Sequence, residues 1–324
     1  MTKLSKASAP AKIILFGEHF VVYGNPAILA SINRRITVTA RFINSDKIII
    51  RSDIKAAGEY CDSTFNPLKG NMKAKSTLDP LYNAIKYVLA ARNQKVGIET
   101  DIFSEVPHGI GLGSSAASCV ATIAAVDSLF GKPDIRKICE QAIESERMIH
   151  KNSSGADCYI STFGGLMHYN KIGGFQRIKA KNTLPLVIGD TGIKHSTGDL
   201  VARVKKFKDR NGSLFEALSR QACDICSQAT VAISSNNREI IGRLMNKNQE
   251  ILKKIGVSHE KIDDLIRICT MAGALGVKMT GAGGGGAIIA LAGSMKDSSK
   301  IASQIKAHGY DSFEARIDYK GLNV

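Results

Sequence analysis

The first hundred residues carry short runs of β-branched and apolar side chains that are typical of strands. Residues 36–42 and 47–51 are two such runs, and the turn-forming residues between them predict a β-hairpin. Residues 96–103 alternate loosely between apolar and polar side chains, so we expect another strand there. Apolar residues recur at helical spacing over residues 78–91, which predicts a helix with Pro80 in its first turn.

Beyond residue 107 a glycine-rich turn leads into a mostly helical pattern with short strands between the helices. The expected helices cover residues 114–130 (closed by Gly131), 133–150, 197–207, 213–233, 238–252, 259–274 and 297–308. The expected strands cover residues 164–169, 175–179, 184–190, 277–279 and 287–292. Because strands dominate early and helices late, we predict an α+β fold with two lobes, residues 1–180 and residues 181–324.

Composition narrows the class of protein. The 324 residues are 44% hydrophobic and 23% charged, which excludes a disordered, collagen-like or coiled-coil chain. Lys and Arg number 44 against 29 Asp and Glu, a net charge of +15 that attracts anions such as nucleic acid, membrane headgroups or phosphorylated small molecules. A basic nucleic-acid-binding protein is the less favoured interpretation, because only 6% of residues are aromatic, Trp is absent and the lysines are spread along the chain.

The apolar and cysteine patterns predict a cytoplasmic protein that does not bind a membrane. No apolar run approaches the roughly 20 residues that cross a bilayer, and none near the N-terminus resembles a signal peptide. Seven scattered cysteines are expected to be reduced thiols. Cys223 and Cys226 form a lone Cys-x-x-Cys without a second pair of ligands, which argues against a zinc site.

The glycine-rich turn at residues 107–117 has the composition of an anion site. Gly109, Gly111 and Gly113 permit positive φ and let the backbone approach a ligand closely. Ser114 and Ser115 stand where a helix is expected to begin, so free backbone N–H groups and the positive end of the helix dipole face the turn. The alternative, a plain turn capped by serine, is disfavoured because unneeded glycine costs about 0.5–1 kcal/mol of backbone entropy.

Two further segments suggest parts of the same site. Residues 280–286 hold five glycines between two apolar runs, which favours a close approach to a ligand or another loop over a flexible linker. Residues 146–157 begin with Glu146 at the expected end of a helix and finish in a polar turn at Asp157. Asp157 is either a turn residue or a catalytic one. A divalent ion bound with a nucleotide needs few protein oxygens, which Ser115, Glu146 and Asp157 supply if they converge.

At this point the segments resemble the GHMP kinase superfamily, which includes galactokinases, homoserine kinases, mevalonate kinases and phosphomevalonate kinases. Residues 107–117 are similar to its motif Pro-x-x-x-Gly-Leu-Gly-Ser-Ser-Ala-Ala, and residues 278–286 are similar to its C-terminal glycine motif. Residues 9–27 and 146–165 are most similar to the mevalonate kinase family. The resemblance extends from about residue 6 to residue 292 and is weakest in 44–78 and 199–252.

The resemblance implies a two-lobed fold with ATP and substrate bound between the lobes, and it implies roles for matching positions. Asp157 is the catalytic base, and Lys12 interacts with it and with the acceptor hydroxyl. Ser115 and Glu146 hold Mg²⁺. Glu18, His19 and Thr197 contact the acceptor, mevalonate. ATP contacts the loop and a serine before it: Ser104, Gly109, Ile110, Gly111, Leu112, Gly113, Ser114 and Ser115.

The implied activity is ATP-dependent phosphorylation of mevalonate to 5-phosphomevalonate, in isoprenoid biosynthesis. The alternatives are a kinase for phosphomevalonate or homoserine and an inactive relative that senses a ligand; the presence of Lys12, Glu146 and Asp157 argues against the latter. Whether Asp157 accepts a proton or only orients the hydroxyl stays open, as do a homodimer, feedback inhibition and nucleotide preference. Some relatives have arginine where His195 stands, so that substrate contact is also open.

Overall fold

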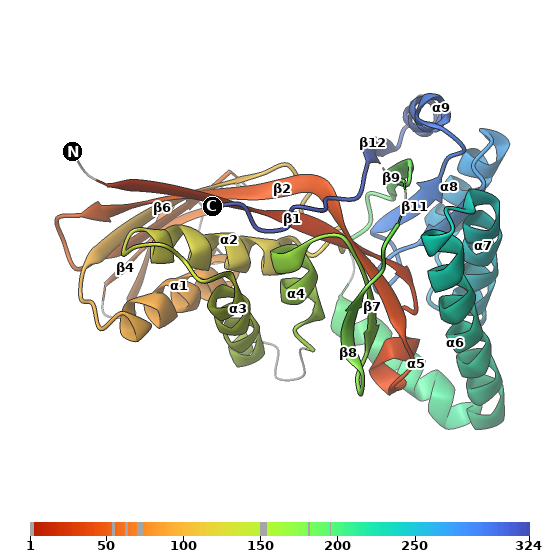
Figure 1. Cartoon of the computed structure of the whole chain (residues 1–324), viewed down its shortest axis with the longest axis horizontal. Helices are drawn as coiled ribbons and strands as arrows, with labels where there is room; N and C mark the ends of the chain where they lie inside the picture. Colours follow the sequence, from red (N-terminus) through yellow and green to blue (C-terminus); the bar gives the residue numbers. More distant parts are fainter. Residues whose placement is uncertain are drawn as a thin grey trace.

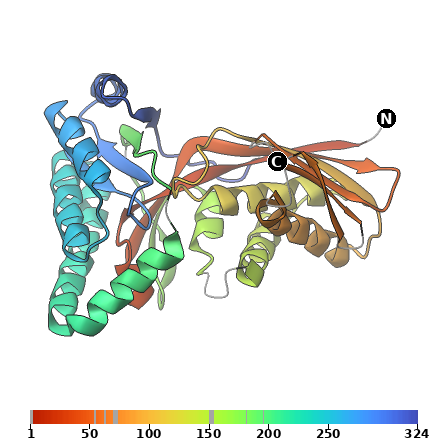
Figure 2. The same ribbon diagram turned by 180° about the vertical axis from the view of Figure 1, so that it is seen from behind.

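A computed structural model of the chain describes residues 3–53, 56–61, 64–69, 74–149, 154–180, 182–194 and 196–324. These residues form two lobes side by side along the long axis of the molecule (Figure 1). The first lobe is a sheet with α1–α4 on one face, and the second is a smaller sheet beside α6–α9 (Figures 1 and 2). This mixed arrangement agrees with the predicted α+β class.

The sheet of the first lobe has eight described strands in the order β5-β4-β3-β6-β2-β7-β8, with β1 paired to β2. The strands are β1 (Leu4–Phe16), β2 (Ala27–Ile43), β3 (Ile48–Ser52), β4 (Ala56–Cys61), β5 (Thr64–Lys69), β6 (Gly97–Ser104), β7 (Leu166–Asn170) and β8 (Gly174–Arg177). A short 3₁₀ helix, η1 (Phe20–Tyr23), connects β1 to β2. The long strands β1 and β2 extend from the first lobe towards the second (Figure 1).

The hairpin predicted at residues 36–51 is wrong, because β6 lies between its two strands. β2 pairs antiparallel with β6, and β3 pairs parallel with the other edge of β6 and antiparallel with β4. Gly97 at the start of β6 makes this insertion possible, since a Cβ there would stand 2.2 Å from the carbonyl oxygen of Ser45. The turn-forming residues therefore carry the chain across β6 instead of folding it back on itself.

The helices of the first lobe bury α2 in the centre of the core. They are α1 (Ala74–Ala91), α2 (Ser114–Ser128), α3 (Ile135–Ile149) and α4 (Ala156–Phe163). α2 packs against β1, β2, α1, α3 and α4, and its alanines allow these close approaches. Pro80 lies well inside α1, which begins four residues before the predicted start, so its placement in the first turn was wrong. The short helix α4 was not predicted.

The second lobe follows the predicted elements closely. Its antiparallel sheet has the order β10-β11-β9-β12 and comprises β9 (Leu186–Asp190), β10 (Gly276–Met279), β11 (Ala287–Leu291) and β12 (Asp311–Ala315). Its helices are α5 (Thr197–Arg210), α6 (Gly212–Ser234), α7 (Arg238–Lys254), α8 (Glu260–Met271) and α9 (Met295–Ala307). Only β12 has no counterpart in the sequence prediction.

Contacts between distant parts of the chain connect the two lobes. The C-terminal segment returns to the first lobe, where Asn323 pairs with Ser8 on β1 (Figure 1). In a second contact, Phe20 of η1 stacks on Phe215 of α6 with ring centroids 5.4 Å apart. The boundary at residue 180 stays a prediction. None of the described helices has the length and apolar character needed to span a membrane.

Candidate active site

The glycine-rich turn before α2 forms a loop with the backbone geometry that anion binding needs. Gly109, Gly111 and Gly113 have φ values of 82°, 83° and 70°, a region that L side chains rarely adopt. The side chains of Ile110 and Leu112 are 4% and 2% exposed, so they anchor the loop in the core. The loop therefore offers its backbone to a ligand, and the first N–H groups of α2 lie at its end.

A pocket of about 290 Å³ opens beside this loop. Its polar lining comes from β3, α1, β6, the loop and α2, namely Ser52, Ser76, Thr77, Ser104, His108, Ser114, Ser115 and Ser118. Leu78, Pro80 and Leu81 of α1 and Ile102 of β6 supply an apolar wall. This combination suits a flat apolar group joined to phosphates. Ser104 also bonds the backbone of Val106, which fixes the turn that leads into the loop.

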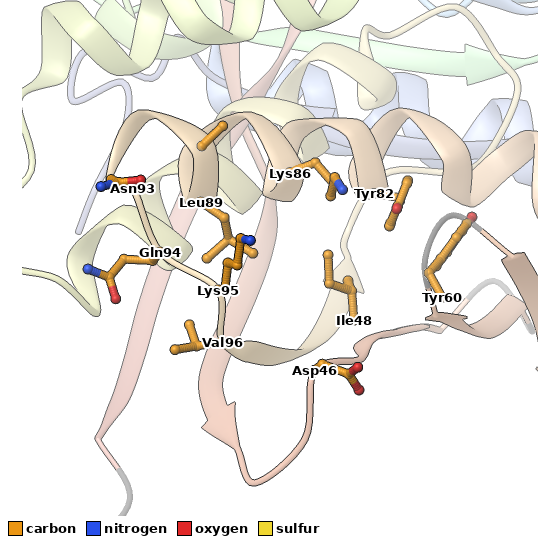
Figure 3. Close-up of a pocket in the computed structure, with 11 residues that line it drawn as sticks. Asp46, Ile48, Tyr60, Tyr82, Lys86, Leu89, Asn93, Gln94, Lys95 and Val96 are labelled. Carbon is orange, nitrogen blue, oxygen red and sulfur yellow. The ribbon is translucent and has the colours of Figure 1, made fainter.

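A second pocket, of about 470 Å³, lies between α1 and β3 and contains none of the predicted site residues. Figure 3 shows Ile48 and Val96 below α1 and the rings of Tyr60 and Tyr82 at one end. The two rings stack with centroids 4.1 Å apart. The hydroxyl of Tyr60 donates to Asp79 at 2.9 Å, so this ring pair stabilises the packing of α1 on the sheet.

The Lys12 ammonium lies 3.2 Å from the Asp157 carboxylate, which confirms that these two residues meet. The side chain of Lys12 is 7% exposed and that of Asp157 is 33% exposed, so of the two groups the carboxylate is the more accessible to a ligand. Lys12 also donates its backbone N–H to the carbonyl of Leu112 at 2.9 Å. At Gly113 a Cβ would stand 2.5 Å from Cγ of Lys12. The loop therefore packs directly on the aliphatic part of Lys12.

Asp157 stands in the first turn of α4 and not in the polar turn that the sequence suggested. α4 starts after Gly155, which has a φ of 73°. A Cβ added at this position would stand 2.8 Å from the side chain of Ile143. The positive end of a helix dipole stabilises a carboxylate in this position. The sequence signal for this helix was Gly155 directly before Ala-Asp, which parallels Gly113 before Ser-Ser at the start of α2.

Glu18 and His19 lie between β1 and the C-terminal glycine segment. Glu18 is fully buried in direct contact with the Lys278 ammonium of β10, which is also fully buried. Burial raises the pKa of Glu18 and lowers the pKa of Lys278, and each charge opposes the shift of the other. His19 has a φ of 62°, and its Nε2 is 2.8 Å from the carbonyl oxygen of Ala282. Because a carbonyl only accepts, Nε2 carries the proton; burial lowers the pKa of His19.

The C-terminal glycine segment lies against the loop, as its composition predicted. Gly281 and Gly283–Gly286 all have positive φ. A Cβ on Gly281 would stand 3.4 Å from the carbonyl oxygen of Gly111. At Gly283 and Gly285 a Cβ would collide with Met279 and Ile193. These glycines let the segment connect β10 to β11 while it touches the loop before α2.

Comparisons with known proteins agree with this geometry. The model of the GHMP kinases N terminal domain matches residues 79–165, and that of the GHMP kinases C terminal domain matches residues 229–311. A mevalonate kinase of Pyrococcus furiosus is 39% identical over 98% of this chain and 97% of its own length. One of Thermococcus sibiricus is 37% identical, with the same coverage of 98% and 97%.

The chain belongs to the mevalonate kinase family of the GHMP kinases. Among solved structures, L. major mevalonate kinase in complex with R-mevalonate superposes with a TM-score of 0.84 and 27% identity over 98% of this chain and 97% of that chain. The mevalonate kinase of Methanococcus jannaschii superposes with a TM-score of 0.82 and 27% identity, covering 98% and 99%. The predicted family and fold are confirmed, and ATP is the co-substrate of such a kinase.

The surroundings of Glu146 and Ser115 bear on the magnesium site that the sequence predicts. Glu146 accepts a hydrogen bond from the Cys158 thiol at 3.6 Å, which places its carboxylate next to α4. Glu146 lies on α3, which packs against α2. Burial, with the Glu146 charge adding to it, raises the pKa of the Cys119 thiol of α2 to about 12. Cys119 is one helical turn beyond the exposed hydroxyl of Ser115.

No group of three His, Cys, Asp or Glu side chains within the described ranges could hold a metal ion. Mg²⁺ is usually held by one or two carboxylates together with substrate phosphates and water, so its site does not require such a group. The individual roles of Ser115 and Glu146 stay predictions.

The structure places Thr197 at the start of α5, where its side chain is exposed. Leu200 of the same helix would touch a Cβ on Gly284 at 3.0 Å, so α5 begins beside the glycine segment. His195 lies outside the described residues. Sequence reasoning missed Lys194, an exposed cation whose Cε would be 3.7 Å from a Cβ on Gly109. Only its position near the loop reveals it.

The described cysteines are free thiols, as predicted. Cys226 is fully buried in α6, and its thiol donates to the carbonyl of Pro26 at 3.3 Å. Burial raises the pKa of Cys226, which makes it a packing residue and not a reactive one.

Proposed function

We propose that this chain transfers the terminal phosphoryl group of ATP to mevalonate and so forms 5-phosphomevalonate for isoprenoid biosynthesis. The observation that carries the proposal is the Lys12–Asp157 pair, 3.2 Å apart, packed against the loop before α2. A hydroxyl placed beside this pair meets a carboxylate and an ammonium at the place where the phosphates end. The full-length similarity to mevalonate kinases supports mevalonate as the substrate that carries this hydroxyl.

The residues of the chain act mainly by positioning and by balancing charge, which phosphoryl transfer requires more than covalent chemistry. Backbone N–H groups of the loop and of the first turn of α2 hold the phosphates. Asp157 orients the acceptor hydroxyl and takes its proton as the bond to phosphorus forms, while Lys12 stabilises the charge that develops on that oxygen.

Ser115 and Glu146 are the residues that would hold Mg²⁺, which supplies positive charge to the phosphate oxygens when it is bound. Glu18, His19 and Thr197 are proposed to shape the acceptor side. For Glu18 this role is indirect, because its side chain is fully buried. A cytoplasmic location stays a prediction from the sequence, and a homodimer stays open.

A coupled assay of ADP release tests the proposal, with mevalonate, phosphomevalonate, homoserine and galactose compared at matched concentrations. Reactions without an acceptor give the ATP hydrolysis that must be subtracted. We expect mevalonate to have the highest kcat/KM. A kcat/KM for phosphomevalonate or homoserine about tenfold higher than that for mevalonate would show that the acceptor is assigned wrongly. This ratio corresponds to about 1.4 kcal/mol of transition-state preference.

A further inference from the structure

Two lysines lie against the glycine loop before α2, one from each lobe. Lys12 of β1 packs at Gly113, where a Cβ would stand 2.5 Å from its Cγ. Lys194, from the segment between β9 and α5, packs at Gly109. A Cβ on Gly109 would stand 3.7 Å from Cε of Lys194 and 3.8 Å from its Cδ and Cγ. The aliphatic part of Lys194 therefore lies along the start of the loop, as that of Lys12 does at its end.

The charges of these two lysines are balanced differently. The Lys12 ammonium is paired with the Asp157 carboxylate at 3.2 Å. The side chain of Lys194 is exposed, and none of the Asp and Glu side chains that the structure describes forms an ion pair with it. The positive charge of Lys194 is therefore available to an anion that lies on the loop.

Hydrogen bonds to the C-terminal glycine segment fix the backbone that leads to Lys194. The backbone N–H and the hydroxyl of Thr191 both donate to the carbonyl of Gly286, at 2.9 and 2.8 Å. Gly286 in turn donates its N–H to the carbonyl of Ile193 at 2.9 Å, and Ile193 donates its own N–H to the Thr191 hydroxyl at 3.2 Å. Because the position of the preceding residue is fixed in this way, less conformational entropy is lost when the Lys194 ammonium binds an anion.

The place of Lys194 on the loop favours phosphate groups as that anion. Backbone N–H groups and a helix dipole supply only partial positive charges, whereas a lysine ammonium supplies a full charge and three donors. A nucleoside triphosphate carries more negative charge than one Mg²⁺ ion balances. A carboxylate on the acceptor could also attract an ammonium. However, the acceptor hydroxyl is proposed to lie beside Lys12 and Asp157, at the end of the loop that Gly113 marks, and Lys194 lies at Gly109.

We propose that Lys194 is a ligand of the phosphate groups of the nucleotide, which the second lobe contributes to the glycine loop of the first. The inference rests on the proposed function for the identity of the nucleotide as a triphosphate. It adds a full positive charge to a loop that otherwise offers backbone N–H groups. Part of the affinity for ATP then depends on one exposed side chain of the second lobe.

Calorimetric binding of a non-hydrolysable ATP analogue, with Mg²⁺ and without an acceptor, tests the proposal in Lys194→Met and Lys194→Arg. Lys300→Met is the matched control, because Lys300 is also an exposed lysine of the second lobe, on α9, which packs on β9, β12 and α8. Inorganic tripolyphosphate and adenosine, used as competitors of the analogue, measure the phosphate and nucleoside contacts separately. Thermal melts check that each variant is folded, which we expect because both lysines are exposed.

We expect Lys194→Met to raise Kd for the analogue by about tenfold, the effect of losing one charge-assisted hydrogen bond. Kd for tripolyphosphate should rise by a similar factor, and Kd for adenosine should not change. Lys194→Arg keeps the charge, so its Kd should stay within about threefold of the wild-type value. Lys300→Met should stay within about twofold. Added salt should weaken binding more in the wild type than in Lys194→Met, because salt screens an exposed charge.

Equal Kd values for the analogue in the wild type and in folded Lys194→Met would overturn the proposal. A rise in Kd for adenosine as large as that for tripolyphosphate would also overturn it, since the change would then act on the whole pocket. So would an unchanged Kd for the analogue together with a raised KM for the acceptor, which would place Lys194 on the acceptor side. Binding is measured without an acceptor, so a wrong assignment of mevalonate would appear only in the ADP-release assay and leave this comparison intact.

Discussion

Replacing Asp157 by Asn separates the two roles that its position allows. The change keeps the size of the side chain and its place in the first turn of α4. It removes the negative charge that lies 3.2 Å from the Lys12 ammonium, and with it the proton acceptor. A residue that only caps local backbone should tolerate this change, since Asn makes similar backbone hydrogen bonds.

The structure sets the expected cost in stability. The Asp157 side chain is 33% exposed, so its ion pair with Lys12 contributes at most about 1 kcal/mol to the free energy of unfolding. The helix dipole adds about 0.3–1 kcal/mol. The melting temperature should therefore fall by only a few degrees in a chain of this size. Loss of a general base instead lowers kcat by about 10²–10⁴-fold, which is about 3–5 kcal/mol of barrier.

The assay is kcat with both substrates saturating, beside KM for ATP and a thermal melt. We expect kcat to fall by about 10²-fold or more while KM for ATP changes little. Lys12→Met combined with Asp157→Asn should lose much less than the product of the single losses, since residues that act as a unit are not additive. A melting temperature several degrees lower with kcat near the wild-type value would refute the catalytic role.

Three further predictions concern neighbouring residues. Gly113→Ala and Gly24→Ala both put a side chain at positive φ, but only the first collides with Lys12. We therefore expect both variants to lose stability in thermal melts, Gly113→Ala the more, and kcat to fall for Gly113→Ala alone. Equal kcat values for the two variants would show that the packing of residue 113 on Lys12 does not affect catalysis. Glu146→Gln should raise the Mg²⁺ concentration for half-maximal rate; an active variant with unchanged Mg²⁺ dependence would exclude Glu146 as a ligand. The pKa of His19 is lowered by burial, so below its ordinary value of 6.5 the unfolded chain binds a proton that the folded chain refuses. Stability should therefore fall as pH falls from 7 to 5, and His19→Asn should show a smaller fall in melts across that range; an identical pH dependence would contradict this.

The sequence predicted no range for strands β1, β4, β5 and β12, and it predicted the partners of the other strands poorly. Residues 96–103 were expected as a strand and form β6, yet nothing in their pattern says that they insert between residues 36–43 and 48–52. Periodicity reports which face of a strand is buried, whereas its neighbours depend on the whole sheet. Gly97 is a local sequence feature that the insertion requires, because a side chain there would collide with the backbone of Ser45. This requirement is visible only in the folded structure.

Helix α4 escaped prediction because its residues favour strands. Tyr159, Ile160 and Thr162 are β-branched or aromatic, and eight residues are too few for a stable isolated helix. The helix forms because Ala156 and Ile160 are buried and α4 packs on α2 and β1. Tertiary packing thus decided the element that carries Asp157, although the family motif had already marked the residue.

Lys278 shows the opposite limit of sequence reasoning. It is the single charged residue of an apolar strand, and the glycine motif that follows it predicts a close approach of the backbone but no role for this side chain. Its partner Glu18 is 260 positions away, so only the fold shows that the two charges cancel. The motif around Glu18 predicted that this residue contacts the acceptor substrate. Because its side chain is completely buried, any effect on the acceptor must be indirect.

The carboxylates of Glu18 and Asp157 differ in exposure, and this difference favours different tasks for them. Glu18 is fully buried against Lys278, so it cannot reach the hydroxyl of an acceptor without leaving a charge unpaired in the interior. Asp157 is one-third exposed in the first turn of a helix, so it can meet a substrate. Environments that set titratable groups apart in this way also assign their roles in an active site. If the proposed reaction holds, we therefore expect the proton of the acceptor to go to Asp157 and not to Glu18.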